Sequence, residues 1–241
     1  AHKYVVAKIC ETTDISAERE LLAFSRIDSL KSSHTGSSLL RKMLDTFEIS
    51  NRGQKHTCFI HEPLGMSLET CRCFFPDGKF PDIMIKSVLK TEARMVHTDL
   101  KAANIHFSIA DEGILKAYED KQLAHPSARK ITEEAVIDES RGIGWDREFP
   151  GRSSRPTLID FGEARCGRDV HHGLIQPAAY RAPEVTLGMP WDSSVDIWNL
   201  GVLTWHLRHN ELLFTNTPRE DEDMAYHEVP RMIEELKNAT Y

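Results

Sequence analysis

Two short polar motifs carry the residue types that transfer of a phosphoryl group requires. One reads VHTDLKAAN and the other LIDFG. Asp99 of the first motif can orient a hydroxyl group and accept its proton, while Asn104 and Asp160 can hold magnesium. Lys101 can neutralise charge on the phosphate that moves. This chemistry asks for positioning and charge neutralisation more than for covalent work by the protein.

A third motif, YRAPE at residues 180–184, makes the pair more specific. Each motif alone is a weak signal. Together they are strong, because three unrelated spacings must coincide in one order.

Apolar patterns predict the elements that would position these residues. Residues 4–10 and 55–61 are apolar, β-rich runs that predict strands. Residues 14–27 carry an apolar stripe at helical spacing, with Asp14 as a candidate cap. Further helices are predicted over residues 80–90, 194–207 and 225–237, and the second of these is apolar enough to be buried.

Residues 109–156 differ in composition from the rest of the chain. They carry many charges, together with several glycines and prolines. This composition predicts an insert or long loop, with a short helix around residues 110–121. Strand-like residues 157–159 then lead into Asp160.

The composition of the whole chain limits the class of protein. With 241 residues, 40% hydrophobic and 28% charged, it is typical of a globular protein with one large domain or two lobes. The net charge of -7 argues against nucleic-acid binding and leaves room for a basic protein partner. No apolar stretch approaches the length of a membrane span, and no leader is apparent. The odd number of cysteines, without a C-x-x-C pair, predicts reduced thiols in an intracellular protein, in the cytoplasm or nucleus.

The chain resembles a protein kinase along nearly its whole length, and most closely the SR-protein (serine/arginine-rich) kinase family. The subfamily resemblance rests on His97-Thr98-Asp99, on the long insert between Asn104 and Asp160, and on the segment from Ile175 to Glu184. One departure is Phe161, where close relatives often have Leu.

The resemblance implies an α+β, two-lobed kinase-like fold, truncated at both ends. Residues 1–62 would form a partial small lobe that binds nucleotide. Residues 63–241 would form a partial, mainly helical large lobe with the insert at about 109–156. ATP and Mg²⁺ are the implied cofactors, and a monomer is expected.

The resemblance also assigns roles in the small lobe and at the connection between the lobes. Lys8 would contact the α- and β-phosphates, with Glu20 as its ion-pair partner and Glu18 as the alternative. The carbonyl of Glu62 and the N–H of Leu64 would bind adenine. Pro63 can lie between them because no backbone N–H is needed at that position.

In the large lobe, Asp99, Lys101 and Asn104 would be catalytic, and Asn104 and Asp160 would hold the metal. His61 would be the gatekeeper beside the adenine site, an unusual choice of residue. Asp196 would hold the backbone of the catalytic loop.

The same resemblance predicts the substrate and the mode of regulation. The order Asp99-Leu100-Lys101 favours a Ser/Thr acceptor, and the family implies serine in Arg/Ser-rich proteins. Thr98 stands where many kinases have an Arg that holds an activation-loop phosphate, and no Ser, Thr or Tyr lies between Phe161 and Tyr180. We therefore expect the activation segment to fold without phosphorylation.

Two other features have alternative interpretations. The acidic run at residues 219–223 is either a dock for Arg-rich substrates or a solvated face. The adjacent His171 and His172 are better explained as a solvated loop than as a metal site.

Other features of the sequence favour an alternative function. No G-x-G-x-x-G occurs, the last large-lobe helices are expected to be missing, and the helix before the catalytic loop is shorter than in the family by roughly 10 Å. The alternative is a degenerate or fragmentary pseudokinase that acts as a non-catalytic binding module. A small-molecule kinase is a third possibility, although the YRAPE motif and the helix around Asp196 argue against it.

Overall fold

The computed structural model describes residues 3–11, 15–29, 38–51, 53–80, 95–132, 136–139, 141–143, 154–167 and 170–214. Several sequence predictions fall outside these residues. They are the cap at Asp14, residues 81–90 of one predicted helix and the shortened segment that follows, the acidic run at 219–223, and the helix at 225–237.

One part of the fold is a three-stranded antiparallel sheet packed with a helix. The strands are β1 (Val6–Ile9), β2 (Asp45–Asn51) and β3 (Gln54–His61), in the order β1-β3-β2. The helix α1 (Ile15–Ser29) buries one face, because Ala17, Glu20, Ala23 and Phe24 recur at helical spacing. These elements confirm the two strands and the helix predicted from the sequence, whereas β2 was not predicted.

Two smaller sheets lie beyond the connection at Glu62 and Pro63. The strands β4 (Leu64–Ser67), β6 (Ile105–Ser108) and β9 (Pro156–Leu158) form one antiparallel sheet in the order β4-β6-β9. The strands β5 (Met95–Val96) and β10 (Arg165–Cys166) form the other. Between β4 and β5 lie α2 (Leu68–Cys71) and 3₁₀ turns at Arg72–Phe74 and Pro76–Gly78.

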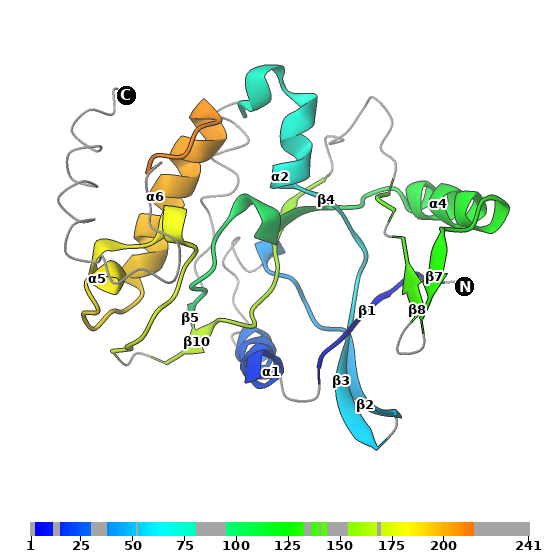
Figure 1. Cartoon of the computed structure of the whole chain (residues 1–241), viewed down its shortest axis with the longest axis horizontal. Coiled ribbons are helices and arrows are strands. Elements are labelled where there is room, and N and C mark those ends of the chain that lie inside the picture. The colour runs from blue at the N-terminus through cyan, green and yellow to red at the C-terminus, as the bar shows by residue number, and fades with distance from the viewer. Residues whose placement is uncertain are drawn as a thin grey trace.

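The segment between β6 and β9 has more regular structure than the sequence predicted. It contains α4 (Glu112–Ala124), close to the predicted short helix, and a hairpin of β7 (Arg129–Ile131) and β8 (Val136–Asp138). The hairpin was not predicted, and it favours the alternative of a structured insert over that of a long loop. Figure 1 shows α4, β7 and β8 together at one end of the molecule, away from α5 and α6.

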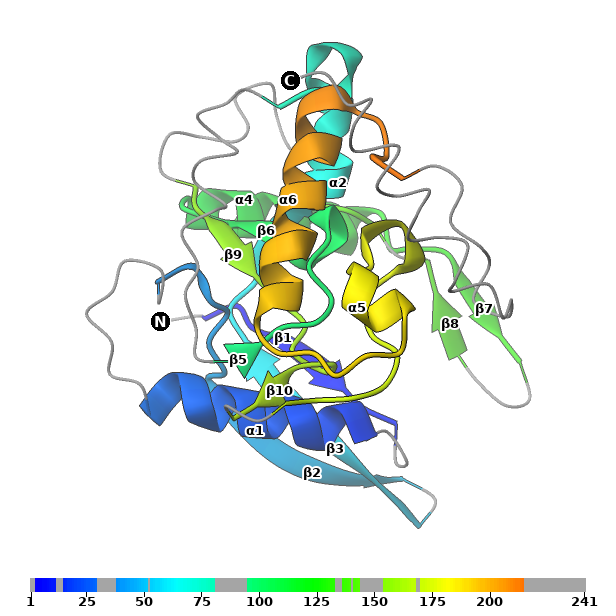
Figure 2. The ribbon, with the colours of Figure 1, turned by 90° about the vertical axis from the view of Figure 1, so that its left-hand side faces the viewer.

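The other end of the molecule is helical. It contains a 3₁₀ turn (Ala178–Tyr180), α5 (Pro183–Thr186) and α6 (Ser194–His209). The helix predicted at 194–207 is confirmed as α6, but only one face is buried, since Ile197 is 71% exposed. Figure 2 shows α1 running below β5 and β10, with α6 rising above these strands, opposite α1.

An apolar core joins α1, β5, β6, β9 and α6. It runs from Phe24 of α1 through Phe161 to Leu203 and Leu207 of α6. Packing of segments far apart in sequence against one another thus fixes the loops that bear the polar motifs. No helix in the described part of the chain is long and apolar enough to cross a membrane.

Candidate phosphoryl-transfer site

The loop between β5 and β6 presents Asp99 with its carboxylate already oriented. Lys101 Nζ lies 2.8 Å from Asp99 Oδ2, and Asn104 Nδ2 donates to the same oxygen at 2.8 Å. Asn104 Nδ2 also donates to the Asp99 carbonyl at 3.0 Å, and a 3₁₀ turn at Ala102–Asn104 sets the spacing. The three residues predicted to be catalytic are therefore in mutual contact. A carboxylate held in this way can accept a hydrogen bond from a hydroxyl group in a fixed direction.

Asp196 binds the backbone of this loop. At the start of α6, its two carboxylate oxygens accept from the backbone N–H groups of His97 and Thr98, at 2.6 and 2.9 Å. Burial raises the pKa of Asp196, and the two backbone donors oppose that rise. The carboxylate is thus placed where the resemblance predicted a support for the loop backbone.

His97 is buried and uncharged. Its Nε2 contacts the Ile159 carbonyl at 3.1 Å, and the Asp99 N–H donates to Nδ1 at 3.2 Å. Since Nδ1 accepts, the ring proton is assigned to Nε2. Burial lowers the pKa of His97, in agreement with a neutral ring. The ring thus ties the loop of Asp99 to the segment that ends in Asp160.

Lys8 joins the small sheet, α1 and the second motif. Its Nζ lies 2.6 Å from Glu20 Oε2 and 3.2 Å from Asp160 Oδ1. Burial would lower the pKa of Lys8, but the hydrogen bonds and charges of Glu20 and Asp160 outweigh it and raise that pKa. Glu20 is 2% exposed and forms the ion pair, whereas Glu18, the alternative partner, points to solvent.

Arg41 is a further cation at this site, and the sequence analysis missed it. Its backbone N–H donates to the Leu158 carbonyl at 2.9 Å, which places it beside the strand that leads to Asp160. Burial lowers the pKa of its guanidinium, while the charges of Glu20 and Asp160 raise it. Its Nε is buried and has no hydrogen-bond partner within the described residues. The only sequence signal was a pair of adjacent basic residues, Arg41 and Lys42, between apolar residues in the run that starts at Leu39.

The oxygen groups of Asp160 and Asn104 fit a magnesium ion. Mg²⁺ is a hard cation that usually takes one or two protein oxygen ligands, with water and phosphate oxygens completing its shell. Asp160 offers a carboxylate that is 46% exposed. The Asn104 amide nitrogen is occupied by Asp99, which leaves the amide oxygen as the ligand. Among the described residues no cluster of three His, Cys, Asp or Glu suggests a different kind of metal site.

The connection between β3 and β4 consists of Glu62 and Pro63, followed by Leu64 at the start of β4. His61 ends β3 and is fully buried against the Phe24 ring, at a centroid distance of 5.2 Å. Its Nδ1 contacts the Lys42 carbonyl at 2.9 Å, and its buried Nε2 has no partner in the described structure. Burial lowers the pKa of His61 to about 4, so the ring is neutral at physiological pH.

Three aromatic rings connect α1 with the catalytic loop. The Phe161 ring lies 5.4 Å from that of Phe24 and 5.4 Å from that of His97. Phe161 is fully buried, so its packing explains why a large apolar side chain is needed after Asp160. These edge-to-face contacts thus pack α1 and the catalytic loop against the same ring.

The segment after Phe161 is anchored at its far end by Gln176. Gln176 Nε2 donates to the Val195 carbonyl at 2.7 Å, and its Oε1 accepts from the Ala182 N–H at 2.8 Å. His171 is less solvated than predicted: it is partly buried, because its ring packs on Trp191 at a centroid distance of 5.0 Å. His172 is exposed, as expected for a loop.

Comparisons with known proteins agree with this geometry. No protein-family model matches the chain. A serine/threonine protein kinase of Aspergillus fumigatus is 36% identical over 232 residues, which are 96% of this chain and 58% of that protein. AFC3, a serine/threonine-protein kinase of Arabidopsis thaliana, is 28% identical over 88% of the chain and 50% of its own length. The serine/threonine-protein kinase SRPK of Physarum polycephalum is 26% identical over 81% of the chain and 51% of its own length.

A solved structure shows the same fold. The crystal structure of a kinase domain superposes with a TM-score of 0.59 and 24% identity, and the match covers 90% of this chain and 60% of that one. The chain spans between 50% and 58% of the length of the three related kinases named above. The chain thus has the fold of a kinase domain, and the related sequences that it matches are serine/threonine protein kinases, which include SRPK and AFC3.

Proposed function

We propose that the protein transfers the γ-phosphoryl group of ATP to a serine or threonine hydroxyl. The observation that carries the proposal is the convergence of Lys101 Nζ and Asn104 Nδ2 on one oxygen of Asp99. In this mechanism Asp99 orients the acceptor hydroxyl and takes its proton as the oxygen attacks phosphorus. Lys101, fixed on Asp99, stabilises negative charge on the phosphoryl oxygens.

The nucleotide would lie between the two polar motifs. Lys8 would bind the α- and β-phosphates, held in place by Glu20, while Asn104 and Asp160 would hold Mg²⁺. A bound magnesium ion neutralises the phosphate charge. The backbone groups of Glu62 and Leu64 would bind adenine at the connection between β3 and β4. The adjacent sheets and the contacts among Lys8, Glu20 and Asp160 support this placement.

The proposed acceptor is serine in an arginine-rich segment. The support is the resemblance to SR-protein kinases, the SRPK relative and the net charge of -7. A cytoplasmic or nuclear location is part of the same proposal, because no disulfide joins the cysteines that the structure describes.

Phosphate transfer from labelled ATP to an Arg-Ser repeat peptide tests the proposal, with a Glu-Ser repeat as the control peptide. Transfer should require Mg²⁺, should prefer the Arg-Ser peptide, and should fall by at least about a hundredfold in Asp99→Asn. Asp120→Asn is the matched control, since Asp120 lies on α4 and pairs with Lys116 at 2.6 Å, away from the site. A thermal shift with Mg-ATP but no transfer would favour a non-catalytic binding module. The absence of both would refute the proposal.

A further inference from the structure

Glu163, the residue that follows Asp-Phe-Gly, contacts three different segments. Its carbonyl accepts from Thr98 Oγ1 at 2.7 Å. Its carboxylate Oε2 accepts from Arg19 Nη1 at 3.0 Å and lies 3.5 Å from Arg165 Nη2. Through one residue, the activation segment is thus joined to the catalytic loop, to α1 and to β10.

The contact with Thr98 is buried and specific. Thr98 is 1% exposed and has a φ of 66°, a left-handed conformation that is strained for a β-branched residue. Its N–H donates to Asp196 and its hydroxyl to Glu163, so two hydrogen bonds hold the strained residue in place. The hydroxyl of Thr98, which precedes Asp99, therefore binds the activation segment directly.

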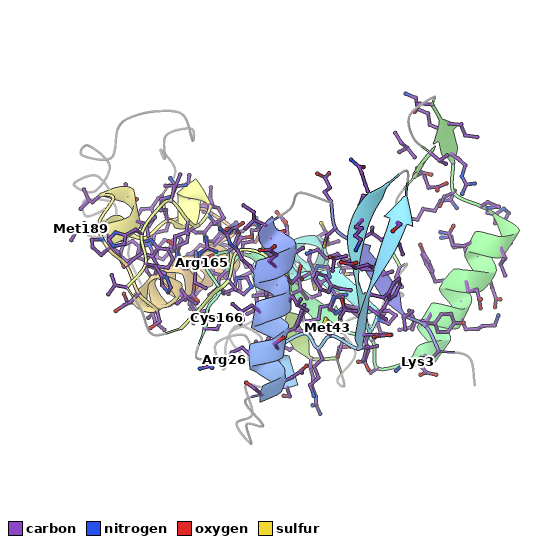
Figure 3. The ribbon with its side chains drawn as sticks, turned by 90° about the horizontal axis from the view of Figure 1, so that it is seen from below. Lys3, Arg26, Met43, Arg165, Cys166 and Met189 are labelled. Carbon is purple, nitrogen blue, oxygen red and sulfur yellow. The ribbon has the colours of Figure 1, made fainter. Side chains whose placement is uncertain are left out.

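The ion pair with Arg19 links Glu163 to α1. Arg19 immediately precedes Glu20, whose carboxylate pairs with Lys8. α1 packs against β10, and Figure 3 shows Arg165 and Cys166 beside this helix. An ion pair at Arg19 therefore favours the rotation of α1 that directs Glu20 toward Lys8.

We propose that Glu163 is a positioning residue whose carbonyl and carboxylate together hold the activation segment against the catalytic loop and α1, in the absence of a phosphate. The proposal rests on the proposed kinase function and adds to it the residues that replace phosphorylation. No Ser, Thr or Tyr lies between Phe161 and Tyr180, so no phosphate can form in this stretch, and the Glu163 carboxylate supplies a negative charge there instead.

The two contacts of Glu163 can be removed separately. Glu163→Gln and Arg19→Gln remove the ion pair but keep the backbone carbonyl that Thr98 binds. Thr98→Val keeps the side-chain shape and removes only the hydroxyl donor. Because Arg19 is 34% exposed and Glu163 52%, the ion pair is screened by solvent and its effect is modest.

The experiment measures kcat and KM with phosphatase-treated protein. Glu163→Gln should lower kcat about threefold, an effect that shrinks at high salt. Thr98→Val should lower kcat about tenfold, with recovery in Thr98→Ser. Arg19→Gln should add little to Glu163→Gln, and the exchange Arg19→Glu with Glu163→Arg should restore part of the rate.

Glu48→Gln is the matched control, since Glu48 pairs with Lys55 at 3.1 Å on the exposed β2–β3 hairpin. Three results would each overturn the inference: loss of wild-type activity after phosphatase treatment, rates in Glu163→Gln and Thr98→Val equal to wild type, or independent effects of Arg19→Gln and Glu163→Gln. Hydrogen exchange of α1 provides a readout that needs no activity. Glu163→Gln should speed exchange in α1, and Glu48→Gln should not. Wild-type protein without transfer would count against the proposed function, whereas unchanged α1 exchange would count against the role of Glu163.

Discussion

Replacement of Lys8 by methionine should destabilise the protein in a pH-dependent way, because it leaves the carboxyl of Glu20 buried without its nearest cation. Removal of one partner from a fully buried ion pair costs about 3–5 kcal/mol. Lys8 is 38% exposed, and Arg41 remains as a second cation facing Glu20. Both facts reduce the effect, and we expect a loss of about 2 kcal/mol in the free energy of unfolding at about pH 7.5.

The sign of the pH dependence follows from the pKa of Glu20. Burial already raises this pKa, while Lys8 and Arg41 lower it and Asp160 raises it. Without Lys8 the folded-state pKa rises further above the unfolded value. A carboxyl group of this kind favours the folded state when protonated, so stability is lost as the pH rises through the folded pKa. Lys8→Met should therefore lose less stability, about 1 kcal/mol, at about pH 5.

Urea unfolding of wild type and Lys8→Met at both pH values measures the difference. Lys55→Met is the matched control, because Lys55 is 71% exposed and its pair with Glu48 is on the surface. The control should change stability by less than about 0.5 kcal/mol at either pH. An equal loss for Lys8→Met at both pH values would refute the reasoning and would indicate that Arg41 alone keeps Glu20 ionised.

Two further predictions concern buried rings. Burial lowers the pKa of His61 to about 4, whereas the pKa of histidine in the unfolded chain is near 6.5. Wild type therefore loses stability as the pH falls from about 6.5 to about 4. His61→Phe should lose less stability over this window, as measured by urea midpoints. A steeper acid dependence in His61→Phe would contradict this prediction. Phe161→Leu should change the free energy of unfolding by less than about 1.5 kcal/mol, whereas Phe161→Ala should lose about 3–5 kcal/mol in the same assay, since it leaves a cavity between the Phe24 and His97 rings. Equal losses for the two Phe161 variants would contradict the importance of ring volume.

The sequence predicted well those features that depend on local patterns. An apolar stripe at helical spacing located α1, an apolar run located α6, and β-rich runs located β1 and β3. The choice between Glu18 and Glu20 could not be made locally, since both lie within one turn of α1. The contact with Lys8 decides it.

Features that depend on distant contacts could not be predicted. Arg41 gave no periodic signal, because its surroundings consist of Glu20 and Asp160, which lie elsewhere in the chain. β2 has an alternating but strongly polar sequence, and its pairing with β3 holds it in the sheet. The assignment of the lobes near residue 62, and of roles to individual site residues, remains a prediction.

The pairing of β6 with β9 has a consequence for the length of the chain between them. Ile105 pairs with Leu158, and the Ser108 N–H donates to the Arg155 carbonyl at 2.8 Å. The intervening segment thus leaves and returns at adjacent points, next to Asn104 and Asp160. For a loop whose ends lie close together, each doubling of its length adds only about 0.6 kcal/mol to the entropic cost of closing it. Segments of very different length could therefore be accommodated here without moving either proposed metal ligand.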